Sequence, residues 1–153
     1  MKRAPFRSWS FPAALAAPLL AAVLVLAGCR TLVPVNPVQG TPFAARPGVT
    51  LEDRSSEVWR AALPLGWTVD EPVLGSATAT LRLRDHVTVV RVDYDVDAYS
   101  IHLVETQNIE RDGDLVHPNV NGWIAHLERE IAAQSMAASA EAAARAARAT
   151  APR

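Results

Sequence analysis

Apolar and polar positions alternate through the middle of the chain, as they do in strands with one buried and one solvated face. In 76–84, small and aliphatic residues alternate with threonines and arginines, and in 87–96 valines alternate with arginine and aspartates. The pattern predicts four strands, over residues 67–71, 76–84, 87–96 and 99–109. Because the links between them are short, we expect successive strands to pair antiparallel as a meander.

Helical periodicity flanks these strands. Apolar residues share one helical face before the strands (Val58, Ala61, Ala62 and Leu65) and another after them (Val120, Trp123, Ile124, Leu127 and Ile131). The first stripe predicts a helix over residues 52–63, ended by Pro64 and Gly66, and the second a helix over residues 119–135. We therefore expect an α+β domain over residues 51–135: a four-stranded antiparallel meander with two helices packed on one face.

The segments on either side of this domain differ from it in composition. Residues 29–50 have no sustained period and contain four prolines, so we expect a Pro-rich tether there and no regular element. In a polyproline-like conformation, at about 3.1 Å per residue, such a tether could span ~60 Å. Residues 136–153 are rich in alanine, which predicts a helical extension that frays towards Pro152.

The first 28 residues have the organisation of a secretory signal peptide. Three basic residues open the segment, and an uncharged, largely apolar run follows up to Gly28. A membrane-spanning helix is the alternative, but the apolar run is short for a span and contains Pro12 and Pro18. We expect residues 1–28 to be a signal peptide that is removed on export.

Cys29 is the single cysteine of the chain and closes the apolar run in the sequence "LAGC". This sequence resembles the bacterial lipobox, in which an aliphatic and two small residues precede a cysteine. The resemblance implies cleavage between Gly28 and Cys29 and a diacylglyceryl thioether on Cys29, which would hold the protein on a membrane. Because Arg30 and not aspartate follows, the resemblance implies the periplasmic leaflet of the outer membrane. The alternative is an ordinary signal peptide cut after Ala27, with Cys29 left free.

The net charge of the chain indicates which classes of partner it can bind. The chain has 15 basic and 16 acidic residues, and removal of the three basic residues of the signal leaves 12 against 16, a mildly acidic protein. Nucleic acid is therefore not expected as a partner, because binding phosphates requires clustered lysine and arginine.

Candidate catalytic and metal-binding residues give little support for an enzyme. Asp93, Asp95 and Asp97 invite a calcium interpretation, but Ala98 and Val104 stand where a calcium loop needs glycine and glutamate. The histidines form no i, i+4 metal pair (His86, His102, His117 and His126). The chain contains no nucleophile elbow and no glycine-rich phosphate loop. We predict a non-enzymatic protein with no metal and no cofactor.

The segment "VHPNVNGW", residues 116–123, is the most distinctive of the domain. Asn119 or Asn121 could cap the following helix, with Trp123 contributing to the core. The alternative is a binding patch, because asparagine side chains at a loop rim can recognise peptide backbone or sugar hydroxyls. The candidate binding residues are Asn108, His117, Asn119, Asn121 and Trp123, with Tyr99 as a further possibility.

Much of residues 55–131 resembles a family of small, functionally uncharacterised proteobacterial lipoproteins. The segments that carry the resemblance are "VWRAAL" with Gly66-Trp67, "ATLRLRDHVTVVRVDYD", "YSI", "ETQNI" and "HPNVNGWI". The resemblance implies an outer-membrane lipoprotein with an α+β domain. Two hypotheses follow. The first is a non-enzymatic interaction module that binds an envelope protein through the open sheet face, a sheet edge or the 117–123 loop. The second is a binder of cell-wall fragments or another small ligand through Asn108 and the 117–123 loop.

Overall fold

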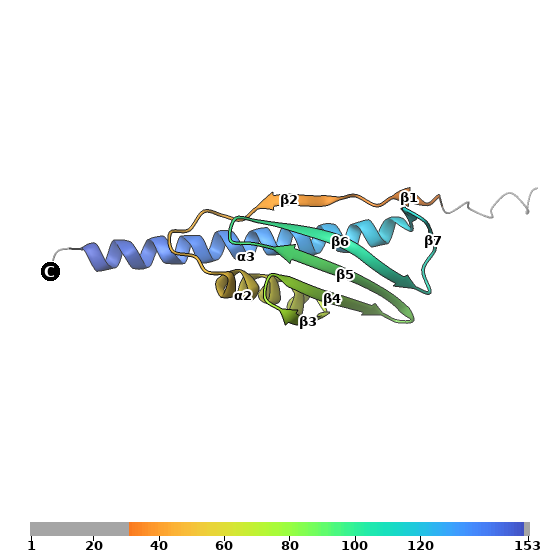
Figure 1. The fold of residues 1–153 in the computed structure, drawn as a ribbon, viewed down its shortest axis with the longest axis horizontal. Coiled ribbons are helices and arrows are strands. Elements are labelled where there is room, and N and C mark those ends of the chain that lie inside the picture. The colour runs from red at the N-terminus through yellow and green to blue at the C-terminus, as the bar shows by residue number, and fades with distance from the viewer. Residues whose placement is uncertain (1–30, 152–153) are drawn as a thin grey trace, which may run out of the picture. The chain divides into compact units, whose positions relative to one another are not determined.

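The computed structural model describes residues 31–151, so the predicted signal peptide and the predicted lipidation site Cys29 lie outside the described residues. Figure 1 shows the arrangement of the elements. In chain order they are β1 (Val33–Pro34), β2 (Val38–Pro42), α2 (Leu51–Ala62), the 3-10 helix η2 (Leu63–Leu65), β3 (Trp67–Val73), β4 (Ser76–Leu83), β5 (His86–Tyr94), β6 (Ala98–Gln107), β7 (Arg111–Asp112), β8 (Leu115–Val116) and α3 (Pro118–Thr150). The predicted α+β class is confirmed.

The main sheet has five antiparallel strands in the order β2-β6-β5-β4-β3. The four predicted strands occur as β3 to β6, and the register places Ala77 opposite Val92 and Val92 opposite Ile101. These three side chains are buried, and both helices pack on this face of the sheet (Figure 1). The prediction of a four-stranded sheet is wrong, because β2 adds a fifth strand beside β6.

The Pro-rich segment before the domain is part of the fold, so the prediction of a tether without regular elements is wrong for residues 33–34 and 38–42. β2 pairs with β6 through Val38, Thr41 and Pro42, and the pairing is interrupted by a bulge. Val38 and Phe43 are buried in the core. Proline at the end of an edge strand costs no ladder hydrogen bond, so periodicity and proline content alone could not reveal this strand.

A second, three-stranded sheet has the order β1-β8-β7. β7 and β8 form within the polar segment that follows β6, and Val33 of β1 lies opposite Val116 of β8. Because only His117 separates Val116 from the start of α3, the small sheet joins the beginning of the described chain to the beginning of the last helix.

The two helices begin at residues with side-chain caps. Thr50 and Asp53 form a reciprocal capping box at the start of α2. At the start of α3 the cap is His117, whose Nδ1 accepts from Asn119 N at 3.2 Å. The prediction that Asn119 or Asn121 is the cap is therefore wrong. Pro118 occupies the first helical position, which needs no donor, so the preceding residue becomes the cap.

Helix α3 covers the predicted 119–135 helix and most of the predicted helical extension after it, and it continues without a break for 33 residues. Among residues 31–151, no helix is long and apolar enough to cross a membrane.

Candidate functional site

Of the predicted binding residues, Tyr99 lies on β6, Asn108 directly follows β6, and the others lie at or near the start of α3. Asn108 follows β6 in a left-handed conformation, with φ of 56°. Its Nδ2 donates to Asp85 O at 2.8 Å, and its carbonyl oxygen contacts His86 Nδ1, so Asn108 joins the end of β6 to the β4–β5 turn. Asparagine tolerates this backbone conformation better than most residues. These contacts explain the residue structurally.

The loop residues before and within the first turn of α3 also have different roles. His117 caps the helix, and Asn119 is exposed. Asn121 points to the N-terminal segment: its Oδ1 accepts from Asn36 N at 3.0 Å and its Nδ2 donates to Pro34 O at 2.8 Å. Because its partners are more than 80 positions away in the sequence, this role could not be predicted from local pattern.

Trp123 lies against a different surface. It lines a small apolar notch of about 80 Å³, together with Leu65, Trp67, Leu81, Leu83 and His126. Tyr99 is buried, and its hydroxyl donates to Glu128 O of α3 at 3.1 Å. Of three cavities within residues 31–151, one is lined by Trp123 and another by Tyr99, and none is lined by Asn108, His117, Asn119 or Asn121. These three cavities therefore do not gather the predicted binding residues, although His117, Asn119 and Asn121 lie together at the start of α3.

The face of the main sheet turned away from the helices carries a connected set of polar side chains, which we call the polar face. The strand register places Ser76, Asp93 and Ser100 in one row and Thr78, Arg91 and His102 in the next. These six residues define the polar face.

Asp93 is the central residue of the polar face. Its carboxylate accepts from Ser76 Oγ at 2.6 Å and from Arg91 Nε at 2.8 Å, and His102 Nε2 lies 3.6 Å away. Burial acts to raise the pKa of Asp93, but the hydrogen bonds from Ser76 and Arg91 outweigh it, so the pKa lies below its usual value. Asp93 is therefore ionised at neutral pH and holds its neighbours in fixed orientations.

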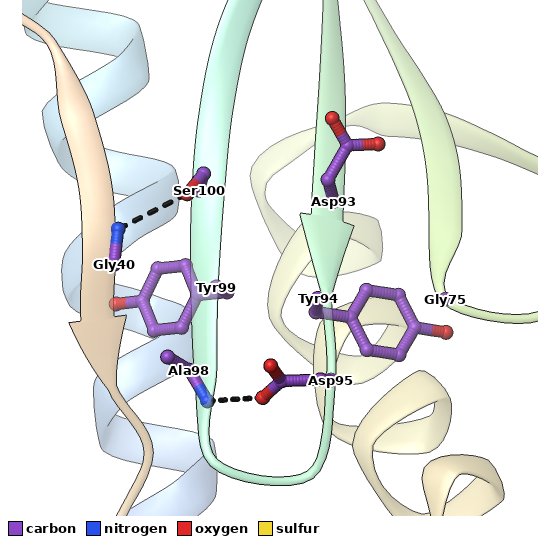
Figure 2. Close-up of a pocket in the computed structure, with 8 residues that line it drawn as sticks. All are labelled: Gly40, Gly75, Asp93, Tyr94, Asp95, Ala98, Tyr99 and Ser100. Carbon is purple, nitrogen blue, oxygen red and sulfur yellow. Dashed lines mark hydrogen bonds between the residues drawn. The ribbon is translucent and has the colours of Figure 1, made fainter.

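A depression of about 350 Å³ opens at one end of the polar face (Figure 2). Asp93 and Ser100 line it beside the β5–β6 turn, together with Gly40, Gly75, Tyr94, Asp95, Ala98 and Tyr99. Ser100 Oγ accepts from Gly40 N of β2 at 3.0 Å, which leaves the serine hydroxyl hydrogen available to a binding partner. Asp95 Oδ1 accepts from the backbone N–H groups of Asp97 and Ala98, and these bonds lower the pKa of Asp95.

Tyr94 and Tyr99 are directly paired across β5 and β6, and their side chains diverge (Figure 2). Tyr99 reaches α3, whereas the Tyr94 hydroxyl donates to Glu71. The Glu71 carboxylate also accepts from Ser55 Oγ and from Trp59 Nε1, the latter at 3.2 Å, both on α2. Tyr99 thus bonds directly to α3, and Tyr94 is linked to α2 through Glu71.

The pKa values of Glu71 and Tyr94 are shifted in opposite directions. Burial acts to raise the pKa of Glu71, but the hydrogen bonds from Ser55, Tyr94 and Trp59 lower it overall. Burial and the bond to Glu71 raise the pKa of Tyr94 to about 12. The Glu71 carboxylate accepts its hydrogen bonds from other groups of the domain, so we interpret Glu71 as a structural residue.

A buried ion cluster connects the N-terminal segment to both helices. Arg54 is 2 % exposed and Glu57 is fully buried, and Arg54 Nη1 donates to Glu57 Oε2 at 2.8 Å. Arg46 Nη2 pairs with the other oxygen of Glu57 at 3.0 Å. Arg54 also donates to Ser135 Oγ of α3 and to the carbonyls of Ala44 and Val96, and its guanidinium lies 4.3 Å from the centre of the Phe43 ring.

Sequence reasoning missed this cluster, because the apolar stripe that predicted the first helix includes neither Arg54 nor Glu57. Their i, i+3 spacing was the available signal, but that spacing is equally typical of exposed helix pairs. With its donors satisfied by carboxylate, hydroxyl and carbonyl oxygens, Arg54 is a structural residue.

Asp93, Asp95 and Asp97, which invited the calcium interpretation, have separate surroundings. Asp93 pairs with Arg91, Asp95 caps the β5–β6 turn, and the carbonyl of Asp97 accepts from Phe43 N. Within the described residues, no group of three histidine, cysteine or acidic side chains is arranged to hold a metal ion.

Comparison of the chain with protein-family models, with curated proteins and with solved structures finds no match. The polar face, with the depression at its end, is therefore taken as the candidate site on its geometry alone.

Proposed function

We propose that this protein is an envelope lipoprotein, anchored through Cys29 to the periplasmic leaflet of the outer membrane, whose domain is a non-enzymatic interaction module. The observation that carries the interaction role is the polar face. Asp93 orients Ser76, Arg91 and His102 on this face before any partner binds, which lowers the entropy that association would cost. The motif around Cys29 supports the anchor.

The shape and chemistry of the polar face favour a protein partner. Hydrogen-bond donors and acceptors, including the oppositely charged Arg91 and Asp93, lie on neighbouring strands, and the depression beside them is open. Small-molecule sites are typically concave and largely apolar, whereas protein interfaces are broader and have polar rims. We expect an envelope protein to bind across β4, β5 and β6.

The anchor is tested by metabolic labelling with radioactive palmitate. The wild-type chain is expected to incorporate label, and Cys29→Ala is expected to incorporate none. Fractionation of the labelled cells then distinguishes the two membranes. An unlabelled wild-type chain, or label that persists in Cys29→Ala, would refute the lipoprotein proposal.

The interaction role is tested by photocrosslinking in cells from two positions. A photoreactive phenylalanine derivative replaces Thr78 on the polar face, and in the control it replaces Ser56, which is exposed on α2. A discrete protein adduct from position 78 and none from position 56 is the expected result. Glycan adducts would favour the alternative, a binder of cell-wall fragments, and the same adducts from both positions would exclude the polar face as a specific interface.

A further inference from the structure

The described chain is held to the domain from its first few residues. Val35 N donates to Asp114 O at 2.9 Å, and Val33 and Pro34 pair with β8. Asn121 adds two hydrogen bonds to the backbone of Pro34 and Asn36. The segment that the sequence suggested as a long flexible tether is therefore fastened to the start of α3.

This attachment limits how far the domain can lie from a lipid on Cys29. Cys29 precedes Val33 by four positions, and four residues span at most about 14 Å even when fully extended. The predicted tether would have allowed a several-fold larger distance between the lipid on Cys29 and the domain. An anchored domain would consequently be kept close to the bilayer by one end.

We propose that the end of the domain formed by β1, β7, β8 and the first turn of α3 lies at the membrane surface, with the C-terminal part of α3 directed away from it. This inference rests on the proposed lipid anchor. β1 and β7 lie at one end of the domain, and α3 runs from that end to the other (Figure 1). A helix of 33 residues is about 50 Å long.

The chemistry of the membrane-facing end fits contact with the headgroup layer and not insertion into hydrocarbon. The β7–β8 region exposes the carboxylates of Glu110, Asp112 and Asp114, and burying ionised carboxylates in an apolar medium is costly. Leu115 beside them is 39 % exposed and offers an apolar contact at the interface. The domain is thus expected to stand on the lipid surface with the polar face accessible from the side.

The orientation is tested on the lipidated full-length protein in vesicles of phosphatidylethanolamine and phosphatidylglycerol that contain lipids with spin-labelled headgroups. Two variants, Asp114→Cys and Ala149→Cys, each carry a fluorophore on the new thiol, because the thiol of Cys29 is used by the lipid. Quenching at position 114 is expected to be several-fold stronger than at position 149. Circular dichroism establishes that both variants fold.

The matched control inserts a flexible 20-residue Gly/Ser linker between Arg30 and Thr31 of each labelled variant. The insertion leaves the domain unchanged but removes the short connection, so the difference between the two positions should shrink. Equal quenching without the insertion would overturn the proposed orientation, while palmitate incorporation into the same samples would leave the anchor intact. Absence of palmitate would overturn both.

Discussion

The inner and outer parts of α3 have the same backbone conformation but different surroundings. In residues 118–135, the side chains of Val120, Ile124, Leu127 and Ile131 are at most 2 % exposed. In residues 136–150 most side chains are exposed, and Met136 is 60 % exposed. The inner part is stabilised mainly by burial against the sheet and α2, whereas the outer part depends on the helix propensity of alanine.

Ser135 lies at the boundary between the two parts. Its hydroxyl accepts from Arg54 Nη1 at 3.2 Å and from Ala44 N at 2.8 Å, so the buried ion cluster meets α3 at its last buried turn. One turn later, Ser139 donates to Ala45 O at 2.8 Å. Beyond that point the ion pair is local, between Glu141 and Arg145. This difference predicts that substitutions on the two sides of the boundary lower the free energy of unfolding by very different amounts.

The largest effect is expected from Glu57→Gln, which removes the charge that compensates two arginines. Leaving a buried charge without its partner typically costs about 3–5 kcal/mol in the free energy of unfolding. The matched control is Glu141→Gln, whose ion pair is exposed and is expected to change stability by less than about 0.5 kcal/mol. Urea denaturation measures both values, and similar costs for the two variants would contradict the comparison.

A second pair of variants compares apolar side chains on either side of the boundary. Leu127→Ala should lower the free energy of unfolding by about 2–5 kcal/mol, because Leu127 is fully buried and its truncation leaves a cavity. Met136→Ala should change it by no more than about 0.5 kcal/mol. Thermal and urea unfolding give both numbers. A large cost for Met136→Ala would indicate that the outer part packs on something in solution.

High pH should weaken the attachment of the inner part. Burial and the charge of Glu128 raise the pKa of Tyr99 to about 12, above the ordinary value of 10.0. The folded state therefore retains the proton that the unfolded state loses, and the stability contribution is present below pH 10 and is lost as the pH rises to about 12. Tyr94 contributes in the same direction.

Unfolding measured at increasing pH tests this expectation. The free energy of unfolding should fall as the pH rises through this range, and Tyr99→Phe should reduce the slope because it removes one of the two titrating groups. An unchanged slope in Tyr99→Phe would show that other groups cause the alkaline dependence.

The smallest expected difference comes from placing glycine in each part. Ala125→Gly should lower global stability by about 1 kcal/mol, which is the cost of glycine relative to alanine in a helix. Ala143→Gly should reduce the helical circular dichroism signal but leave the urea midpoint unchanged, because the outer part can fray while the core stays folded. A shifted midpoint in Ala143→Gly would indicate that the two parts unfold together.

The sequence predicted the individual helices and strands well, but it predicted less well which residues contact one another between them. The period of two in β4 and β5 and the apolar stripes of α2 and α3 led to elements with nearly correct bounds. The open sheet face was one of three surfaces expected to bind a partner, and Asp93 was weighed as a metal ligand, but the hydrogen-bonded set around Asp93 was not predicted. Its partners Ser76 and His102 come from neighbouring strands, and the exact register of those strands follows from tertiary packing.

The sequence by itself determined the α+β class, because periodicity acts over a few residues, and the short motif at Cys29 is the basis of the proposed lipid anchor. Only the tertiary structure decided that residues 38–42 of the Pro-rich segment become an edge strand and that Asn121 fastens the N-terminal segment. Both depend on hydrogen-bond partners that are far away in the sequence and that only the folded chain places side by side. Contacts of that kind leave no local pattern, since an edge strand and a tether can have the same composition.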